Sequence, residues 1–137
     1  MSTSTHTNTY INTETRHLAR LSAVQALYQM EIADHKSKFV VRQFNEDWSQ
    51  DTVSNGDVQA DSEYFALIVL GVVAEQEAVD NAIRARLARN WRLSRLNLTL
   101  RALMRCASYE LLRMFNVPAV VIIDEYVGLA KDFYASK

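Results

Sequence analysis

The scarcity of residues that break regular structure is the strongest constraint on this chain. Only three glycines and one proline are spread over its 137 residues. Sheet proteins turn about every eight to twelve residues, and their turns favour Gly, Pro, Asn and Asp. Hydrophobic residues make up 49% of the chain, which is enough to form a buried core. We therefore expect an all-α fold, a single compact bundle of about five to seven helices.

Apolar residues recur at three- and four-residue spacing, and polar breaks separate the stretches that show this period. We expect one helix that starts near Thr13 and a shorter one that covers Phe39 to Trp48. A longer helix should start at Asp61, with Ser62 as a second candidate for its N-cap, and continue to Leu87 for about seven turns. The next should start at Asn97 or Thr99 and end before Pro118, and the last should cover Ala119 to Phe133. The segment 49–60 is typical of a loop, and 91–96 of a break. Residues 1–12 are rich in Thr, Ser and Asn and are expected to form a disordered polar tail before one domain, 13–137.

Charge is distributed very unevenly, although the net charge is only −1. Between Gln43 and Ile83 there are nine acids and no Lys or Arg. Between Arg84 and Arg113 there are eight arginines and a single acid, Glu110, so this segment carries a net charge of +7. A solvated face is the common fate of such a run, but a local positive field also attracts polyanions.

Residues for catalysis or metal binding are hard to find. The single Cys106 lies among apolar helical positions and is expected in the core, and the three histidines are not spaced as metal ligands. The isolated Gly71 indicates close helix packing rather than a phosphate-binding loop. Asp124 and Glu125 suit either an acid–base pair or a polar patch, and the patch is favoured. We therefore expect a binding protein without catalytic residues, metal or cofactor.

The sequence also restricts the location of the protein. No apolar run approaches the roughly 20 residues of a membrane span, and the N-terminal segment lacks the apolar core of a secretory signal. With no disulfide available to a lone cysteine, a cytoplasmic protein without a membrane association is expected.

Five segments, in order, resemble the NusB family of transcription antitermination factors. They are Arg16 to Gln29 (RHLARLSAVQALYQ), Asp61 to Gly71 (DSEYFALIVLG), Trp91 to Leu96 (WRLSRL), Leu100 to Leu111 (LRALMRCASYEL), and Val117-Pro118 followed by Ile123 to Phe133 (IDEYVGLAKDF). Each motif is weak by itself, but together they span residues 16–133 with consistent spacing.

The resemblance implies an all-helical protein that catalyses no reaction. Such proteins bind the boxA element of ribosomal RNA operon leaders together with NusE, a small-subunit ribosomal protein, within the RNA polymerase antitermination complex. The resemblance leaves monomer and homodimer open. It implies RNA-binding roles for six residues: Arg16, His17, Arg20, Tyr28, Arg101 and Arg105. For Arg105 an internal ion pair with Glu110 or Glu125 is an equal alternative, and NusE is expected on the acidic third helix.

Three departures from the family pattern affect these expectations. His17 and Leu18 stand where the family often has arginines, which predicts weaker RNA binding, and Asp124 replaces a usual Asn. The chain ends at Lys137, whereas family members continue into another helix. Without it, exposed apolar surface is expected to lower stability or promote self-association.

Two further functional readings remain open from the sequence. Some RNA cytosine methyltransferases carry an N-terminal NusB-like domain, and in this reading the chain is such a domain detached from the enzyme. A helical protein-interaction module is the other reading, in which the arginines pair with acids of the same chain.

Overall fold

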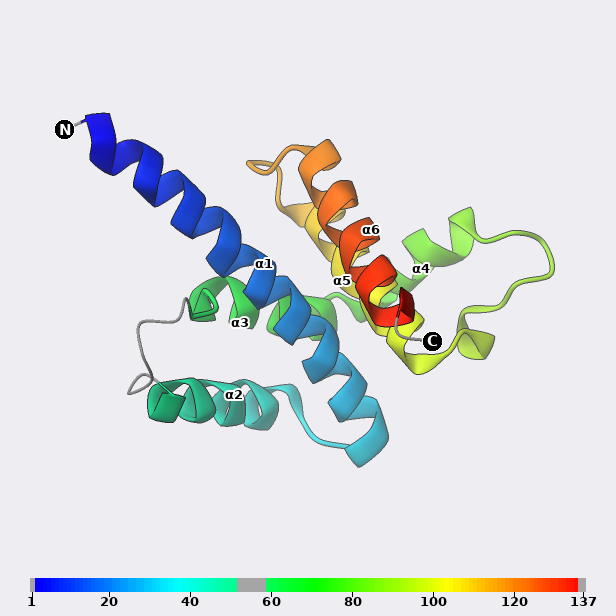
Figure 1. The fold of residues 1–137 in the computed structure, drawn as a ribbon. Helices are drawn as coiled ribbons and strands as arrows, with labels where there is room; N and C mark the ends of the chain where they lie inside the picture. The colour runs from blue at the N-terminus through cyan, green and yellow to red at the C-terminus, as the bar shows by residue number, and fades with distance from the viewer. Residues whose placement is uncertain (1, 52–58, 136–137) are drawn as a thin grey trace.

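The computed structural model describes the backbone of residues 2–51 and 59–135, and the side chains of residues 13–49 and 59–135. Every regular element in these ranges is helical, which confirms the predicted all-α bundle (Figure 1). The elements are α1 (Ser2–Ala33), α2 (Ser37–Asp51), α3 (Ser62–Ala74), α4 (Gln76–Arg86), a short 3-10 helix η1 (Leu93–Arg95), α5 (Leu98–Arg113) and α6 (Ala119–Ala135).

Helix α1 is the central element of the bundle. It packs mainly against α3 and α5, with smaller contacts to α2 and α6, while α2 lies on α3 and α6 lies on α5 (Figure 1). Fully buried side chains from α1, α3 and α6, among them Val24, Phe65, Ile68, Ile122 and Leu129, form one continuous core. Burial of this apolar surface is what holds the helices together, because isolated helices of this length are marginal in water.

Two predicted helix starts are confirmed by their caps. The Asp61 carboxylate accepts a hydrogen bond from the backbone N–H of Tyr64 at 3.0 Å, and the Asn97 side chain accepts one from Leu100 N–H at 2.8 Å. Each bond satisfies a backbone donor that the first turn of a helix leaves without an intrahelical partner. Asn97, not Thr99, is therefore the cap of α5.

The single long helix predicted from Asp61 to Leu87 is wrong. The backbone at Glu75 departs from helical geometry (φ −118°, ψ 30°) and divides this segment into α3 and α4. Apolar periodicity could not detect the break, because Val72 and Val79 are seven residues apart, which is the spacing expected on one face of a continuous helix. The sequence pattern therefore shows no interruption at Glu75.

Helix α1 also differs from its predicted start, since it begins at Ser2 rather than near Thr13. Helical hydrogen bonds are local, so a helix can extend beyond the part that packs. The side chains of residues 1–12 lie outside the described residues, and the polar tail with its domain boundary stays a prediction. The predicted loop 49–60 overlaps the end of α2, and its centre, residues 52–58, also lies outside the described residues.

Cys106 lies in the core, as predicted from its apolar neighbours. Its residue exposure is 0%, and it is a free thiol. No helix among the described residues combines the length and the apolar character that crossing a membrane requires. In the same part of the chain, no three His, Cys, Asp or Glu side chains gather where they could hold a metal ion.

Gly71 and Gly128 are expected to respond oppositely to replacement by Ala. A Cβ atom on Gly71 would overlap the ring of Tyr109 on α5, which confirms the predicted close packing, whereas one on Gly128 meets nothing within 4 Å. Overpacking costs about 1–3 kcal/mol, and Ala gains about 1 kcal/mol over Gly in a helix. Gly128→Ala should therefore raise the melting temperature and Gly71→Ala should lower it. Equal shifts in the two variants would contradict this packing.

Candidate nucleic-acid interface

The six residues predicted to bind RNA lie in two groups along α1. Arg16, His17 and Arg20 lie where α1 meets α3 and α6. Tyr28 lies about 18 Å from Arg16 along the helix axis, since each residue advances a helix by about 1.5 Å. Arg101 and Arg105 of α5 join this second group through Glu31 of α1, since α5 runs antiparallel to α1. The predicted residues therefore do not form one continuous cluster.

Arg20 lies inside the bundle and not on its surface. It is 2% exposed, and its guanidinium donates to both carboxylate oxygens of Glu110, from Nε at 2.8 Å and from Nη2 at 3.0 Å. The guanidinium predicted to contact RNA is therefore already paired with a carboxylate inside the bundle. Sequence spacing correctly placed Arg16 and Arg20 on neighbouring parts of the helix, but it could not show which of them faces the core.

Glu110 is the acceptor at the centre of this buried cluster. It is 0% exposed, and besides Arg20 it accepts hydrogen bonds from the hydroxyl groups of Tyr64 on α3 and Tyr126 on α6. Each carboxylate oxygen thus receives two donors, which is what a buried ionised carboxylate requires. The Arg20–Glu110 cluster, defined here as Arg20, Tyr64, Glu110 and Tyr126, connects four helices.

The pKa values of Arg20, Tyr64 and Tyr126 are raised in this cluster. Burial, together with the hydrogen bond and the negative charge of Glu110, raises the pKa of Tyr64 to about 12. Burial and the neighbouring Cys106 and Glu110 raise the pKa of Tyr126 well above 10.0. Burial alone lowers the pKa of Arg20, but the bond to Glu110 outweighs it and raises that pKa, so Arg20 remains a cation.

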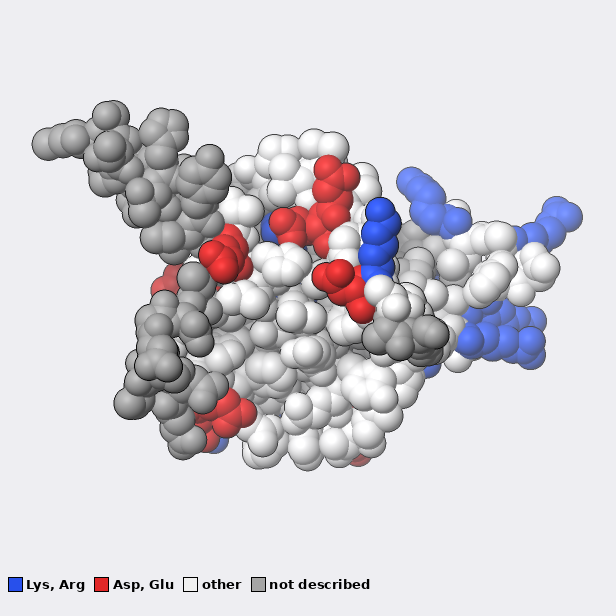
Figure 2. Space-filling view, in the orientation of Figure 1, with Lys and Arg blue, Asp and Glu red and all other residues white. Residues whose placement is uncertain are grey.

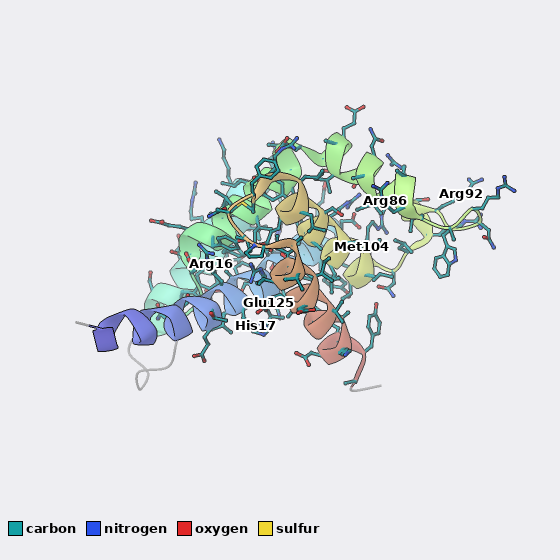
Figure 3. The ribbon with its side chains drawn as sticks, turned by 90° about the horizontal axis from the view of Figure 1, so that it is seen from above. Arg16, His17, Arg86, Arg92, Met104 and Glu125 are labelled. Carbon is teal, nitrogen blue, oxygen red and sulfur yellow. The ribbon has the colours of Figure 1, made fainter. Side chains whose placement is uncertain are left out.

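Arg16 and His17 remain accessible at the edge of this cluster. The Arg16 guanidinium carbon lies 4.6 Å from the centre of the Tyr64 ring, in a cation–π contact that leaves its side chain half-buried. The His17 ring contacts Glu125 of α6 through Nδ1 at 2.8 Å (Figure 3). Asp124 beside it is exposed, so Asp124 and Glu125 form part of a polar surface.

Arg105 is held by acids that the sequence did not suggest. Its Nε and Nη2 atoms donate to the two carboxylate oxygens of Asp80 at 2.8 and 3.1 Å, and Nη1 donates to Glu31 at 2.9 Å. The alternative of an internal ion pair is therefore correct in kind, but its expected partners are wrong. Glu110 and Glu125 are occupied by Arg20 and His17, and Asp80, 25 residues from Arg105 in sequence, could not be found from local spacing.

Arg101 is only partly neutralised. Its Nη1 atom lies 3.5 Å from Glu31, which it shares with Arg105, and Nη2 donates to the backbone oxygen of Leu96 at 3.3 Å. Within the described residues its buried Nε atom has no hydrogen-bond partner. Arg101 thus keeps more of its positive charge available than Arg105 does.

Tyr28 lines a surface hollow between the second half of α1 and the start of α5. The hollow measures about 300 Å³, and its lining comes from three segments: Tyr28, Asn97, Leu98, Thr99, Phe133 and Tyr134. Tyr28 is 41% exposed, and the Tyr134 hydroxyl is hydrogen-bonded to the Asn97 side chain at 3.0–3.1 Å. Aromatic faces beside amide and hydroxyl groups can stack on a nucleobase and bind its edge. The sequence predicted only Tyr28 of this hollow.

Comparison with known proteins agrees with this fold. The model of the NusB family matches residues 17–137. Transcription antitermination protein NusB of Maricaulis maris is 47% identical over 120 residues, which are 87% of this chain and 75% of that protein. The proteins of the same name from Caulobacter vibrioides and Mesorhizobium japonicum are each 43% identical, again over 87% of this chain and over 80% and 77% of their own lengths.

These matches place the chain among proteins named for transcription antitermination, a regulatory and non-catalytic class. The chain belongs to the NusB family, which confirms the resemblance found in its motifs.

Proposed function

We propose that this protein binds the boxA element of ribosomal RNA leaders together with NusE and acts within the RNA polymerase antitermination complex in the cytoplasm. The observation that carries the proposal is membership of the NusB family, whose named relatives are transcription antitermination proteins. Those names also favour this function over the methyltransferase fragment, which no relative reported above suggests.

The accessible members of the predicted set support an RNA surface along α1. Arg16 presents a cation beside an aromatic ring, and Tyr28 exposes an aromatic face next to the hollow. Arg101 adds positive charge from α5. Single-stranded RNA is bound through phosphate contacts combined with stacking of unpaired bases. We assign Arg16, His17, Tyr28 and Arg101 to this surface, and we assign Arg20 and Arg105 to the support of the helices that carry it.

For NusE we propose the exposed face of α3. Leu67, Leu70 and Val73 are each more than a third exposed on this helix, and Glu63 is exposed in its first turn. An apolar stripe with an acid at its end suits a basic protein that also buries apolar surface.

The test is binding of labelled boxA RNA and of a scrambled RNA, with and without NusE, at two salt concentrations. We expect a preference for boxA that strengthens with NusE and weakens with salt. Arg16→Ala and Tyr28→Ala should each weaken boxA binding about tenfold, through a lost phosphate contact and a lost stacking surface. Lys38→Ala, an exposed cation on α2, is the matched control and should bind like the unmodified protein.

Equal binding to boxA and to scrambled RNA, even with NusE present, would overturn the proposal. Unchanged affinity for boxA in both the Arg16→Ala and the Tyr28→Ala variants would keep boxA binding and place its surface elsewhere.

A further inference from the structure

The connection between α4 and α5 carries the densest group of unneutralised cations in the described part of the chain. Five arginines between positions 84 and 95 are exposed, and only Arg84 has a side-chain partner there, Asn81 at 3.2 Å. By contrast, Arg20, Arg101, Arg105 and Arg113 all contact carboxylates. We define the arginine loop as Arg86, Arg89, Arg92 and Arg95 together with Trp91.

The loop is anchored, so its charges are held in place rather than carried on a free segment. Leu93 and Leu96 are each 5% exposed and fix the loop to the core from both sides of Arg95. The turn at Trp91 N–H to Ala88 O (2.9 Å) and the helix η1 order the backbone between them. Leu93 and Leu96 therefore point inward while the arginines and Trp91 are exposed, and the entropy cost of ordering the loop on binding is reduced.

The position of the loop separates it from the Arg16 and His17 group on α1. Figure 2 shows Lys and Arg side chains gathered on the side of the molecule where α4 and its connection to α5 lie. In Figure 3, Arg92 lies at one end of the molecule and Arg86 on the same side, both away from Arg16 and His17. The loop is therefore separate from the Arg16 and His17 group, and its last residue, Arg95, lies two residues before Asn97, which lines the hollow beside Tyr28.

An internal role accounts for only part of this charge. Arg84 and Arg86 lie in the last turn of α4, where positive charge stabilises the helix end. Arg89, Arg92 and Arg95 lie beyond that turn, and among the described side chains none of the three has an acid as a partner. Their mutual repulsion is unfavourable unless an anion neutralises it.

The composition of the loop favours a nucleic acid over a protein partner. Trp91 is 58% exposed and is the only large apolar side chain of residues 84–97 that is more than a third exposed. A protein interface needs a wider apolar centre than one indole ring offers. Arginines that surround a single exposed aromatic ring fit a phosphodiester chain whose unpaired base stacks on that ring.

We propose that the arginine loop is a second binding site for single-stranded RNA, which holds the backbone of the segment beyond the part that contacts α1. This rests on the proposed function, since it assumes that RNA is the ligand. The arginines neutralise phosphates, and Trp91 stacks on a base of any identity. The site therefore adds affinity and salt dependence without adding preference for boxA.

The test compares two triple variants that remove the same charge. Arg86→Gln/Arg89→Gln/Arg92→Gln changes the loop, and Lys36→Gln/Lys38→Gln/Arg42→Gln changes three exposed cations at and near α2. The probe is labelled boxA RNA with flanking segments on both sides, with a scrambled RNA of equal length. All replaced side chains are exposed, and circular dichroism and melting curves check the fold of each variant.

We expect the loop variant to lose at least about tenfold in affinity for both RNAs, while its preference for boxA stays unchanged. Its slope of log affinity against log salt should fall by about 2, since each phosphate contact on a single strand contributes about 0.7. Trp91→Ala should weaken binding about tenfold with an unchanged salt slope. The control triple variant should keep both affinity and slope.

Three outcomes would overturn this site. If both triple variants lose affinity equally, only total charge matters. If the loop variant binds RNA normally but no longer binds NusE, the loop is a protein-binding site. If the loop variant binds both RNA and NusE normally while Arg16→Ala weakens boxA binding, the loop site fails and the proposed function stands. Failure of the unmodified protein to prefer boxA, with or without NusE, is the separate failure of the proposed function.

Discussion

Glu110→Ala is expected to lower the free energy of unfolding by about 3–5 kcal/mol, the typical cost of removing one partner from a buried ion pair. The substitution leaves the Arg20 cation in a site that is 2% exposed, with no carboxylate to neutralise it. It also removes the acceptor of the Tyr64 and Tyr126 hydroxyl groups. Since domains of this size are stable by only about 5–15 kcal/mol, this loss is a large part of the total stability.

Urea unfolding of a set of variants measures this effect. Arg113→Ala is the matched control, because Arg113 also contacts a carboxylate with its Nε atom, that of Glu75 at 2.7 Å, but on the exposed surface. It should unfold close to the unmodified protein, because water screens such pairs. The double variant Arg20→Met/Glu110→Leu leaves no unpaired charge and should lose less stability than the two single variants together. Strict additivity would contradict the ion pair.

Stability is also expected to fall steeply at alkaline pH. The folded state raises the pKa of Cys106 well above 9.0, through burial and the charge of Glu110, and it raises the pKa values of Tyr64 to about 12 and of Tyr126 well above 10.0. Above the ordinary pKa of each group the unfolded chain loses a proton that the folded chain retains. The free energy of unfolding then decreases by about 1.4 kcal/mol per pH unit for each group.

The sign of this dependence defines the pH window. The stabilisation from these three groups is fully present below pH 9.0, begins to fall there because of Cys106, and falls faster from pH 10.0 because of the tyrosines. The contribution of Tyr64 is lost by about pH 12. Urea midpoints between pH 8 and 11 measure the loss, and Cys106→Ala should flatten the curve between pH 9 and 10. A free energy of unfolding that stays constant up to pH 10.5 would rule out this account of the cluster.

Much of the fold was predictable because its determinants are local. The caps at Asp61 and Asn97 depend on one side chain and the backbone three residues later. Pro118 cannot continue the helix before it, because proline lacks the backbone N–H that a helix interior needs, and a new helix can begin after it. The predicted start of that helix at Ala119 is confirmed. Apolar spacing likewise predicted α2 and α5, because the period of a helix is the same in every sequence.

The break at Glu75 and the partners of the arginines were not predictable in this way. Val72 and Val79 lie in register on either side of the break, so the apolar pattern is identical with and without it. Arg105 and Asp80 are 25 residues apart in sequence, and Arg20 and Glu110 are 90 apart. An ion pair over such separations depends on how the helices pack, and each arginine had several acids within plausible reach.

The sequence by itself determined the helical class, most helix positions, the family, and the strong charge asymmetry of the chain. Tertiary structure alone decided which cations are available to a ligand. Packing of α1 on α5 encloses Arg20, and packing of α4 on α5 brings Asp80 to Arg105. The anchored connection between α4 and α5, by contrast, leaves Arg89, Arg92 and Arg95 exposed. The physical reason is that helical periodicity and capping act within a few residues, while burial and ion pairing depend on side chains that only the packed bundle brings together.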